Sequence, residues 1–263
     1  MKKERIDKLI VDKGFIKSRE RAKALIMAGK IFVDGNMVDK CGTKVPIDST
    51  IEIKGTDIPY VSRGGLKLQT ALEAFKIEPK NFICLDIGAS TGGFTDCLLQ
   101  RGALKVYAVD VGRGQLDWKL RQDSRVVSIE QFNAKHLSKR EIPDRVDLVV
   151  ADVSFISLTK ILSVAKKFLK DTGEMIVLVK PQFELSKKDV DRWKGVIRDS
   201  KLHKKAIEKI VSFSKEEGLY PVNLVLSEPR GPKGNKEFLM LISLDKREEY
   251  LTEEKIEEEI SKV

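Results

Sequence analysis

Cysteine, histidine and long apolar runs are all scarce in this sequence of 263 residues. The three cysteines, Cys41, Cys84 and Cys97, are odd in number and have no C-x-x-C spacing, which argues against a disulfide framework and a zinc site. The two histidines, His136 and His203, match no spacing of a metal site or a catalytic triad. We therefore expect reduced cysteines and no metal.

No apolar run approaches the length of a membrane-spanning helix. The longest runs, such as residues 175–179, are as long as a strand, whereas a spanning helix needs about 20 apolar residues. The sequence is charged from Lys2 onward, unlike a secretion signal. These observations predict a cytoplasmic protein with no membrane partner.

The charge balance is basic. The 49 Lys and Arg residues exceed the 40 Asp and Glu residues, for a net charge of +9. A polyanion such as nucleic acid suits this balance, although anionic membranes attract the same residues and many basic proteins bind neither. With 41% apolar residues, the chain is long enough for an α/β domain and a small second domain.

Residues 1–59 predict a small α+β domain that is distinct from the rest of the chain. Two short helical patterns are followed by small strand-like runs that Gly, Asp and Pro separate. Ser18 is placed to cap the second helix, and Gly29 to end it. The cations predicted to contact phosphates are Lys17, Arg19, Arg21, Lys23 and Lys30 around this helix, and Arg63 farther along the chain.

The second helix and the hairpin after it carry a resemblance. Residues 18–22 read Ser-Arg-Glu-Arg-Ala, and residues 28–35 read Ala-Gly-Lys-Ile-Phe-Val-Asp-Gly. This layout resembles the small RNA-binding module shared by a small-subunit ribosomal protein and many pseudouridine synthases, over about the first fifth of the chain. A generic basic cap domain is the alternative.

Residues 60–245 alternate strand-like and helix-like segments, as a parallel α/β sheet does. We predict a Rossmann-like sheet with helices on both faces. Residues 246–263 are rich in Glu and Lys at helical spacing and predict a charged, solvated C-terminal helix. The expected strands are residues 82–87, 105–110, 126–129, 147–151, 175–179, 221–226 and 237–242.

A glycine-rich turn follows the first of these strands, within residues 82–94. Its glycines do not form G-x-G-x-x-G, and Asp86 would face the phosphates of a dinucleotide. An acid there instead suits a sulfonium with an ammonium tail. Asp110 ends the next strand, where a carboxylate can bind both hydroxyls of an adenosine ribose.

This turn predicts an S-adenosylmethionine (SAM) site. A turn with only a structural role would also need glycine. Gln131, after the third strand, is a candidate contact for the adenine edge, although an amide there often caps a helix. The predicted cofactor contacts are Asp86, Gly88, Ser90, Gly92, Gly93, Phe94, Asp110 and Gln131.

Two more chemical groups follow the fourth and fifth strands. Asp152 and Lys180 stand where open α/β sheets bind ligands, at the carboxyl ends of strands. The Asp/Asn-Pro-Pro-Tyr/Phe loop of N6-amine methylases is missing. The absence of this loop argues against methylation of an amine on a base.

Over essentially its whole length the chain resembles the TlyA family, whose members carry both hemolysin and ribosomal RNA methyltransferase names and whose catalytic domain is FtsJ-like. FtsJ-like enzymes methylate a ribose 2'-hydroxyl with a Lys-Asp-Lys-Glu tetrad. Lys67 matches the first Lys within Ser-Arg-x-x-x-Lys-Leu, and Asp152, Lys180 and Glu237 match the others in order. Ser90-Thr91 departs from the Ala-Pro common in FtsJ proteins.

The resemblance implies methyl transfer from SAM to a ribose of ribosomal RNA, free or in ribosomal subunits, with cytidine as the family expectation. A ribose hydroxyl must lose its proton as it attacks the methyl carbon. Two lysines close together disfavour each other's charge, so one can be neutral and accept that proton. We assign the base to Lys180, while Lys67 and Glu237 position the ribose and balance charge.

Two rival functions are open at this stage. One is a non-catalytic RNA-binding or ribosome assembly factor that keeps a vestigial site. The other is a membrane-active hemolysin, which the hemolysin names suggest and the short apolar runs disfavour. SAM binding separates the enzyme from a pure RNA binder.

Overall fold

The chain divides into two compact units, Met1–Asp57 and Ile58–Val263. The computed structural model describes residues 3–16, 18–27, 29–53, 58–231, 234–246 and 250–262. Each unit has its own hydrophobic core, as expected for separately folded domains. The sequence places the domain boundary two residues later, at residue 59.

The N-terminal unit is a small α+β fold with helices α1 and α2. Asp34 and Gly35 have φ values of 49° and 78°, as a tight β-hairpin turn requires, and they join β2 to β3. The Ser18 hydroxyl accepts a hydrogen bond from the backbone N–H of Arg21 at the start of α2. The elements are β1 (Lys3–Arg5), α1 (Ile6–Asp12), α2 (Arg19–Met27), β2 (Ile31–Val33), β3 (Asn36–Val38), β4 (Lys44–Pro46) and β5 (Ile51–Ile53).

The larger unit is built on a sheet that has seven strands among the described residues, in the order β11-β12-β10-β9-β6-β7-β8. The strands are β6 (Ile83–Ile87), β7 (Lys105–Val109), β8 (Val126–Ile129), β9 (Val146–Ala151), β10 (Leu169–Val179), β11 (Tyr220–Leu226) and β12 (Phe238–Ser243). The helices are α3 (Gly64–Phe75), α4 (Gly93–Gln100), α5 (Trp118–Arg121), α6 (Thr159–Ala165), α7 (Pro181–Glu184), α8 (Lys187–Arg192), α9 (Ser200–Glu216) and α10 (Glu253–Ser261), with short 3₁₀ turns η1 (Ala134–His136) and η2 (Lys166–Phe168).

The sheet is mixed, whereas the alternation of segments predicted a parallel sheet. The strands from β10 to β8 are parallel, but β12 runs antiparallel to both β10 and β11. Antiparallel neighbours can be joined by a loop, whereas parallel neighbours need a long crossover, usually a helix. The loop from Leu226 to Phe238 therefore returns the chain in the opposite direction.

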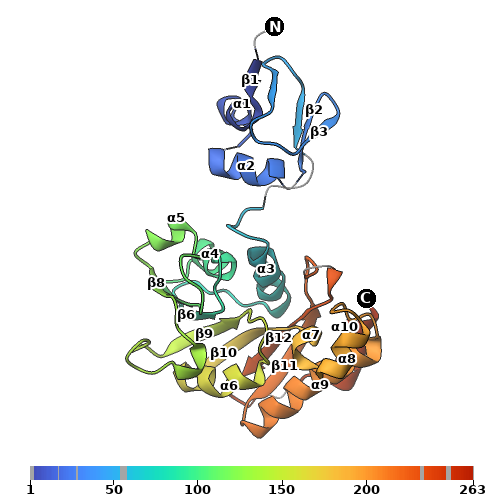
Figure 1. Ribbon diagram of the computed structural model, residues 1–263. Helices are drawn as coiled ribbons and strands as arrows, with labels where there is room; N and C mark the ends of the chain where they lie inside the picture. Colours follow the sequence, from blue (N-terminus) through green and yellow to red (C-terminus); the bar gives the residue numbers. More distant parts are fainter. Residues whose placement is uncertain are drawn as a thin grey trace. The chain divides into compact units, whose positions relative to one another are not determined.

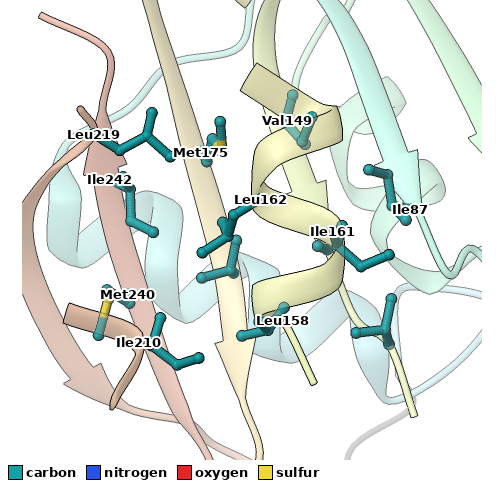
Figure 2. Close-up of a cluster of buried hydrophobic side chains, with 14 of the residues drawn as sticks. Ile87, Val149, Leu158, Ile161, Leu162, Met175, Ile210, Leu219, Met240 and Ile242 are labelled. Carbon is teal, nitrogen blue, oxygen red and sulfur yellow. The ribbon is translucent and has the colours of Figure 1, made fainter. Parts of the chain in front are cut away.

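Both faces of the sheet are covered, as the predicted α/β class requires. Figure 1 shows α3 and α4 on one face and α6 and α9 on the other. Alternate residues of β10 enter two different cores, Met175 and Val177 on one face and Ile176 and Leu178 on the other. Figure 2 shows the first of these cores, where Leu162 of α6 lies among strand residues.

The C-terminal helix differs from the expected solvated helix. In α10, Ile256 and Ile260 are buried in the same core as β10, and Glu259 accepts a hydrogen bond from the backbone N–H of Leu226. Residues four apart share a helix face, so two isoleucines suffice to pack one side of a charged helix. Among the described residues, no helix has the length and apolar character to cross a membrane.

Candidate active site

The sheet brings the predicted site residues to one edge. Gly88, Asp110, Asp152 and Lys180 directly follow β6, β7, β9 and β10, at the carboxyl ends of parallel strands. Glu237 precedes β12, and because β12 is antiparallel its start lies at the same edge. Residues from five strands thus converge.

The glycine-rich turn is fixed by backbone conformation and by space. Gly88 has a φ of 85°, and a Cβ atom there would lie 2.6 Å from the carbonyl oxygen of Asp152. Gly92 has a φ of 92°, and a Cβ there would overlap Leu120. Glycine is therefore required at both positions.

Asp110 joins this turn to a cavity. Its two carboxylate oxygens accept hydrogen bonds from the backbone N–H groups of Ser90, at 2.8 Å, and Gly112, at 2.7 Å. Asp110 lines a cavity of about 470 Å³ whose wall includes the apolar residues Phe132 and Ile161. An apolar slot with one fixed carboxylate at its edge fits adenosine, whose base is flat and whose ribose offers two hydroxyls.

Asp86 lies beneath the turn and lines neither cavity of the site. Its side chain is fully buried, and Thr95 Oγ1 donates a hydrogen bond to Oδ2 at 2.6 Å. Oδ1 has no hydrogen-bond partner among the described residues. Burial raises the pKa of Asp86 to about 7. Asp86 can therefore act on a cofactor through its charge, and the direct contact that the sequence suggested stays a prediction.

Gln131 does not line either cavity. It is exposed and has a left-handed backbone with a φ of 55°, and its N–H donates to the carbonyl of Gly112. The next two residues, Phe132 and Asn133, line the adenosine-sized cavity instead. Phe132 and Asn133 are therefore further candidates for the adenine contact, and the assignment of Gln131 stays a prediction.

Lys180 and Asp152 face a second cavity, of about 380 Å³. Lys180 Nζ donates to Ser154 Oγ at 2.8 Å. It also lies 2.6 Å from Asp152 Oδ1, close enough for an ion pair although off the direction of a regular hydrogen bond. Lys180 is buried apart from this opening, so its ammonium group is held at the cavity wall.

Lys67 and Glu237 form a buried pair beside the same cavity. Lys67 Nζ lies 2.5 Å from Glu237 Oε2, and Gln182 Nε2 donates to Oε1 at 3.2 Å. Lys67 lines the cavity, whereas Glu237 does not. Glu237 therefore holds Lys67 rather than meeting a substrate itself.

Small residues place Lys67 over the turn. A Cβ at Gly65 would overlap the ring of Tyr60, and one at Gly93 would lie 2.3 Å from Ser62 Oγ. The starts of α3 and α4 can therefore pack closely. This contact brings Lys67 to the cavity that Gly93 and Phe94 also line.

Three further residues belong to the site although the sequence did not single them out. Ser154 binds Lys180 and Gln182 binds Glu237. Phe155 is 91% exposed, has a φ of 62°, and its ring lies 5.0 Å from that of Phe183. The only signal in the sequence was proximity to Asp152 and Lys180.

The predicted phosphate contacts differ in their surroundings. Arg19 donates two hydrogen bonds to Asp7, which is fully buried, so part of its guanidinium is already engaged. Lys17 lies outside the described residues. Arg63 is exposed and lines the second cavity, beside Lys67 and Lys180, which we call the reaction cavity. The remaining predicted contacts, Arg21, Lys23 and Lys30, are partly or fully exposed.

The sheet is Rossmann-like, with a glycine turn, an acidic residue after β7 and two lysines that are each paired with a carboxylate. These features define the class of SAM-dependent methyltransferases. The family model described as "FtsJ-like methyltransferase" matches residues 60–244, and the "S4 domain" model matches residues 4–51. The chain belongs to the TlyA family of FtsJ-like methyltransferases, whose cofactor is SAM.

Two curated relatives and one solved structure illustrate the similarity. Hemolysin A of Brachyspira hyodysenteriae is 46% identical over 89% of this chain and 98% of the relative. The "16S/23S rRNA (cytidine-2'-O)-methyltransferase TlyA" of Mycobacterium tuberculosis is 42% identical over 91% of this chain and 89% of the relative. The structure titled "Putative hemolysin from Streptococcus thermophilus" is 41% identical, with a TM-score of 0.76 over 100% of this chain and 96% of that one.

The buried Asp86 predicts a pH dependence. Its pKa rises from 3.8 to about 7 on folding, so its contribution to stability is complete below pH 3.8 and is lost as the pH rises through 7. Asp86→Asn carries no such charge. At pH 8 we expect it to raise the free energy of unfolding by up to about 4 kcal/mol, as measured by urea denaturation.

SAM binding should show the opposite trend, because a cation bound at the turn favours the ionised carboxyl. Calorimetry is expected to give up to about tenfold tighter SAM binding at pH 8 than at pH 6 for the natural protein, and little change for Asp86→Asn. The exposed Asp171→Asn serves as the control. Equal pH profiles for all three proteins would contradict a role for Asp86.

Proposed function

We propose that this protein transfers the methyl group of SAM to a ribose 2'-hydroxyl, in cytidine of ribosomal RNA. One observation carries the proposal. The cavity beside Asp110 and the cavity beside Lys67 and Lys180 share the wall residues Gly88, Ser90, Asp152 and Ser154. A cofactor in the first cavity would present its methyl group to an acceptor in the second.

The chemistry follows from the groups around the second cavity. SAM supplies an electrophilic methyl group on a sulfonium. The ribose oxygen would form the new O–C bond as the bond from the methyl carbon to sulfur breaks and its electron pair stays on sulfur, which leaves a neutral thioether. The ribose proton would pass to Lys180, which must be neutral at that moment. Asp152 and Ser154 hold the Lys180 nitrogen at the cavity wall, and Lys67, held by Glu237, positions the ribose. Alignment of the hydroxyl and the methyl group supplies much of the rate.

The substrate is inferred from the relatives and from the N-terminal unit. The Mycobacterium tuberculosis relative is named for cytidine 2'-O-methylation of 16S and 23S rRNA. S4 domains resemble the RNA-binding module of a ribosomal protein, and residues 4–51 match that family. We assign ribosomal RNA or ribosomal subunits as the partner and the cytoplasm as the location.

The test is methylation of isolated ribosomal subunits, and of protein-free rRNA, with SAM labelled in its methyl group. We expect label on RNA and a 2'-O-methyl mark that blocks alkaline cleavage at a cytidine. Label on a base instead of a ribose would refute the proposed reaction. RNA binding without SAM binding would instead favour an assembly factor.

Phe155 gives a second measurable consequence. Phe155 is 91% exposed on a left-handed backbone, lines the cavity beside Asp110 and directly follows Ser154, which lines both cavities, so its ring is suited to stack on a base. Phe155→Ala is expected to raise KM for RNA about tenfold, with a smaller loss of SAM affinity, and Phe155→Trp to retain activity. The matched control is Leu104→Ala, which removes another exposed apolar side chain next to β7. A similar KM for both alanine variants would exclude stacking.

A further inference from the structure

A group of basic side chains near the reaction cavity has no part in the function derived so far. Arg198, Lys201, Lys204 and Lys236 line a surface pocket of about 470 Å³ between the start of α9 and the end of α10. Arg198 and Lys201 are exposed, and Lys204 and Lys236 partly so. We call this group the basic pocket.

One of the four cations, Lys204, is already paired, and its two carboxylate partners offset two of the four positive charges. Lys204 lies 2.5 Å from a carboxylate oxygen of Glu253 and 2.8 Å from one of Glu257. The other three cations form no ion pair with any residue that the structure describes. Asp199 is close in sequence, but its carboxylate accepts from the backbone N–H of Lys201 and caps α9. The pocket thus keeps an excess of positive charge.

Arg230 extends this charge. Burial of Lys236 and the neighbouring Arg230 charge together lower the pKa of Lys236. Arg230 is itself exposed and pairs with no carboxylate within the described ranges. Two cations held close together without an acid are stabilised by an incoming anion.

The basic pocket shares no described lining residue with the reaction cavity, but two features connect them. Lys236 directly precedes Glu237 of the catalytic set, at the carboxyl edge of the sheet. Arg63, which lines the reaction cavity, donates from Nη2 to the carbonyl oxygen of Arg230 at 3.1 Å. A series of cations therefore runs from Arg63 through Arg230 and Lys236 to Arg198.

We propose that the basic pocket, with Arg230, binds backbone phosphates of the RNA strand whose nucleotide occupies the reaction cavity. This inference rests on the proposed function for the identity of the strand. Unpaired lysine and arginine side chains bind phosphates by releasing condensed counterions. A membrane surface is disfavoured, since Ile260 is the apolar residue in the lining and it is buried, which leaves nothing to insert into lipid.

The test compares two double variants with equal loss of charge. Arg198→Gln/Lys236→Gln removes cations of the pocket. Lys167→Gln/Lys215→Gln removes exposed lysines that precede β10 and β11, at the opposite edge of the sheet. The probes are transcribed 16S and 23S rRNA, in filter-binding titrations from 0.05 to 0.3 M salt.

At 0.15 M salt we expect the pocket variant to bind rRNA about 10 to 30 times more weakly than the natural protein, and its salt slope to fall by about 1.4 to 1.8. The control should bind like the natural protein, and SAM affinity should be equal in all. A second variant, Arg198→Gln/Lys201→Gln, leaves the residue next to Glu237 unchanged and should lose similar affinity.

Equal losses in the pocket and control variants would overturn the proposal. It would also be overturned if the pocket variant kept its rRNA affinity but lost binding to phosphatidylserine vesicles. These readouts do not depend on methyl transfer. A natural protein that shows the pocket-dependent RNA binding but labels no RNA would refute the proposed reaction and leave the phosphate site standing.

Discussion

Replacing Lys180 with arginine is expected to lower the methylation rate by about 10² to 10⁴-fold while SAM affinity stays within about threefold. Arginine keeps the positive charge beside Asp152, so the ion pair with that carboxylate is preserved. It cannot give up its proton near neutral pH and therefore cannot accept one from a ribose. The variant thus distinguishes two roles of Lys180, that of a base and that of a counter-ion for Asp152.

Single-turnover methylation of rRNA and calorimetric SAM titration are the measurements. The control is Lys215→Arg, at an exposed lysine near the end of α9. If Lys180→Arg methylated at the natural rate, Lys180 would not be the base. Lys180→Ala is less decisive, because it also leaves the Asp152 carboxylate without its partner.

The second large effect concerns the buried pair of Lys67 and Glu237. Glu237→Gln removes the negative charge beside an ammonium group that is almost completely buried. We expect the free energy of unfolding to fall by about 3 kcal/mol, since breaking a buried pair leaves one charge uncompensated. The double variant Lys67→Met/Glu237→Gln should recover most of this stability, but not the activity.

Tryptophan fluorescence during urea denaturation can follow this effect. Both tryptophans, Trp118 and Trp193, belong to the unit Ile58–Val263, so the signal reports on the catalytic unit. Glu216→Gln, at the exposed end of α9, is the control. If the single and double variants were equally unstable, the loss would come from altered packing and not from the unpaired charge.

Much of the fold could be predicted from the sequence, because buried strands are continuous apolar runs. The lengths and directions of the strands were harder to predict from the sequence. β10 begins at Leu169 rather than residue 175, since residues 170–174 are polar and pair irregularly with β9. Nothing in the apolar pattern of β12 shows its direction, which depends on the length of the loop before it.

The site residues that belong to a sequence motif could be predicted. Contacts between residues that are far apart in the sequence could not. Lys67 and Glu237 lie 170 positions apart, so only the family pattern could pair them. The burial of Asp86 depends on α4 packing over β6, and the position of Gln131 outside the cavity lining depends on its left-handed backbone. Such details follow from tertiary structure, which periodicity does not encode.

The contact between Gly88 and the Asp152 carbonyl has a practical consequence for engineering. Any side chain at residue 88 would displace the end of β9, which carries Asp152. A substitution intended to change the cofactor cavity would therefore also move Asp152 away from Lys180. Room for SAM analogues with a substituted adenosine is better made on the opposite wall of the adenosine-sized cavity, at Phe132 or Ile161. Smaller side chains at those positions would enlarge the adenosine-sized cavity and leave the wall that the two cavities share unchanged.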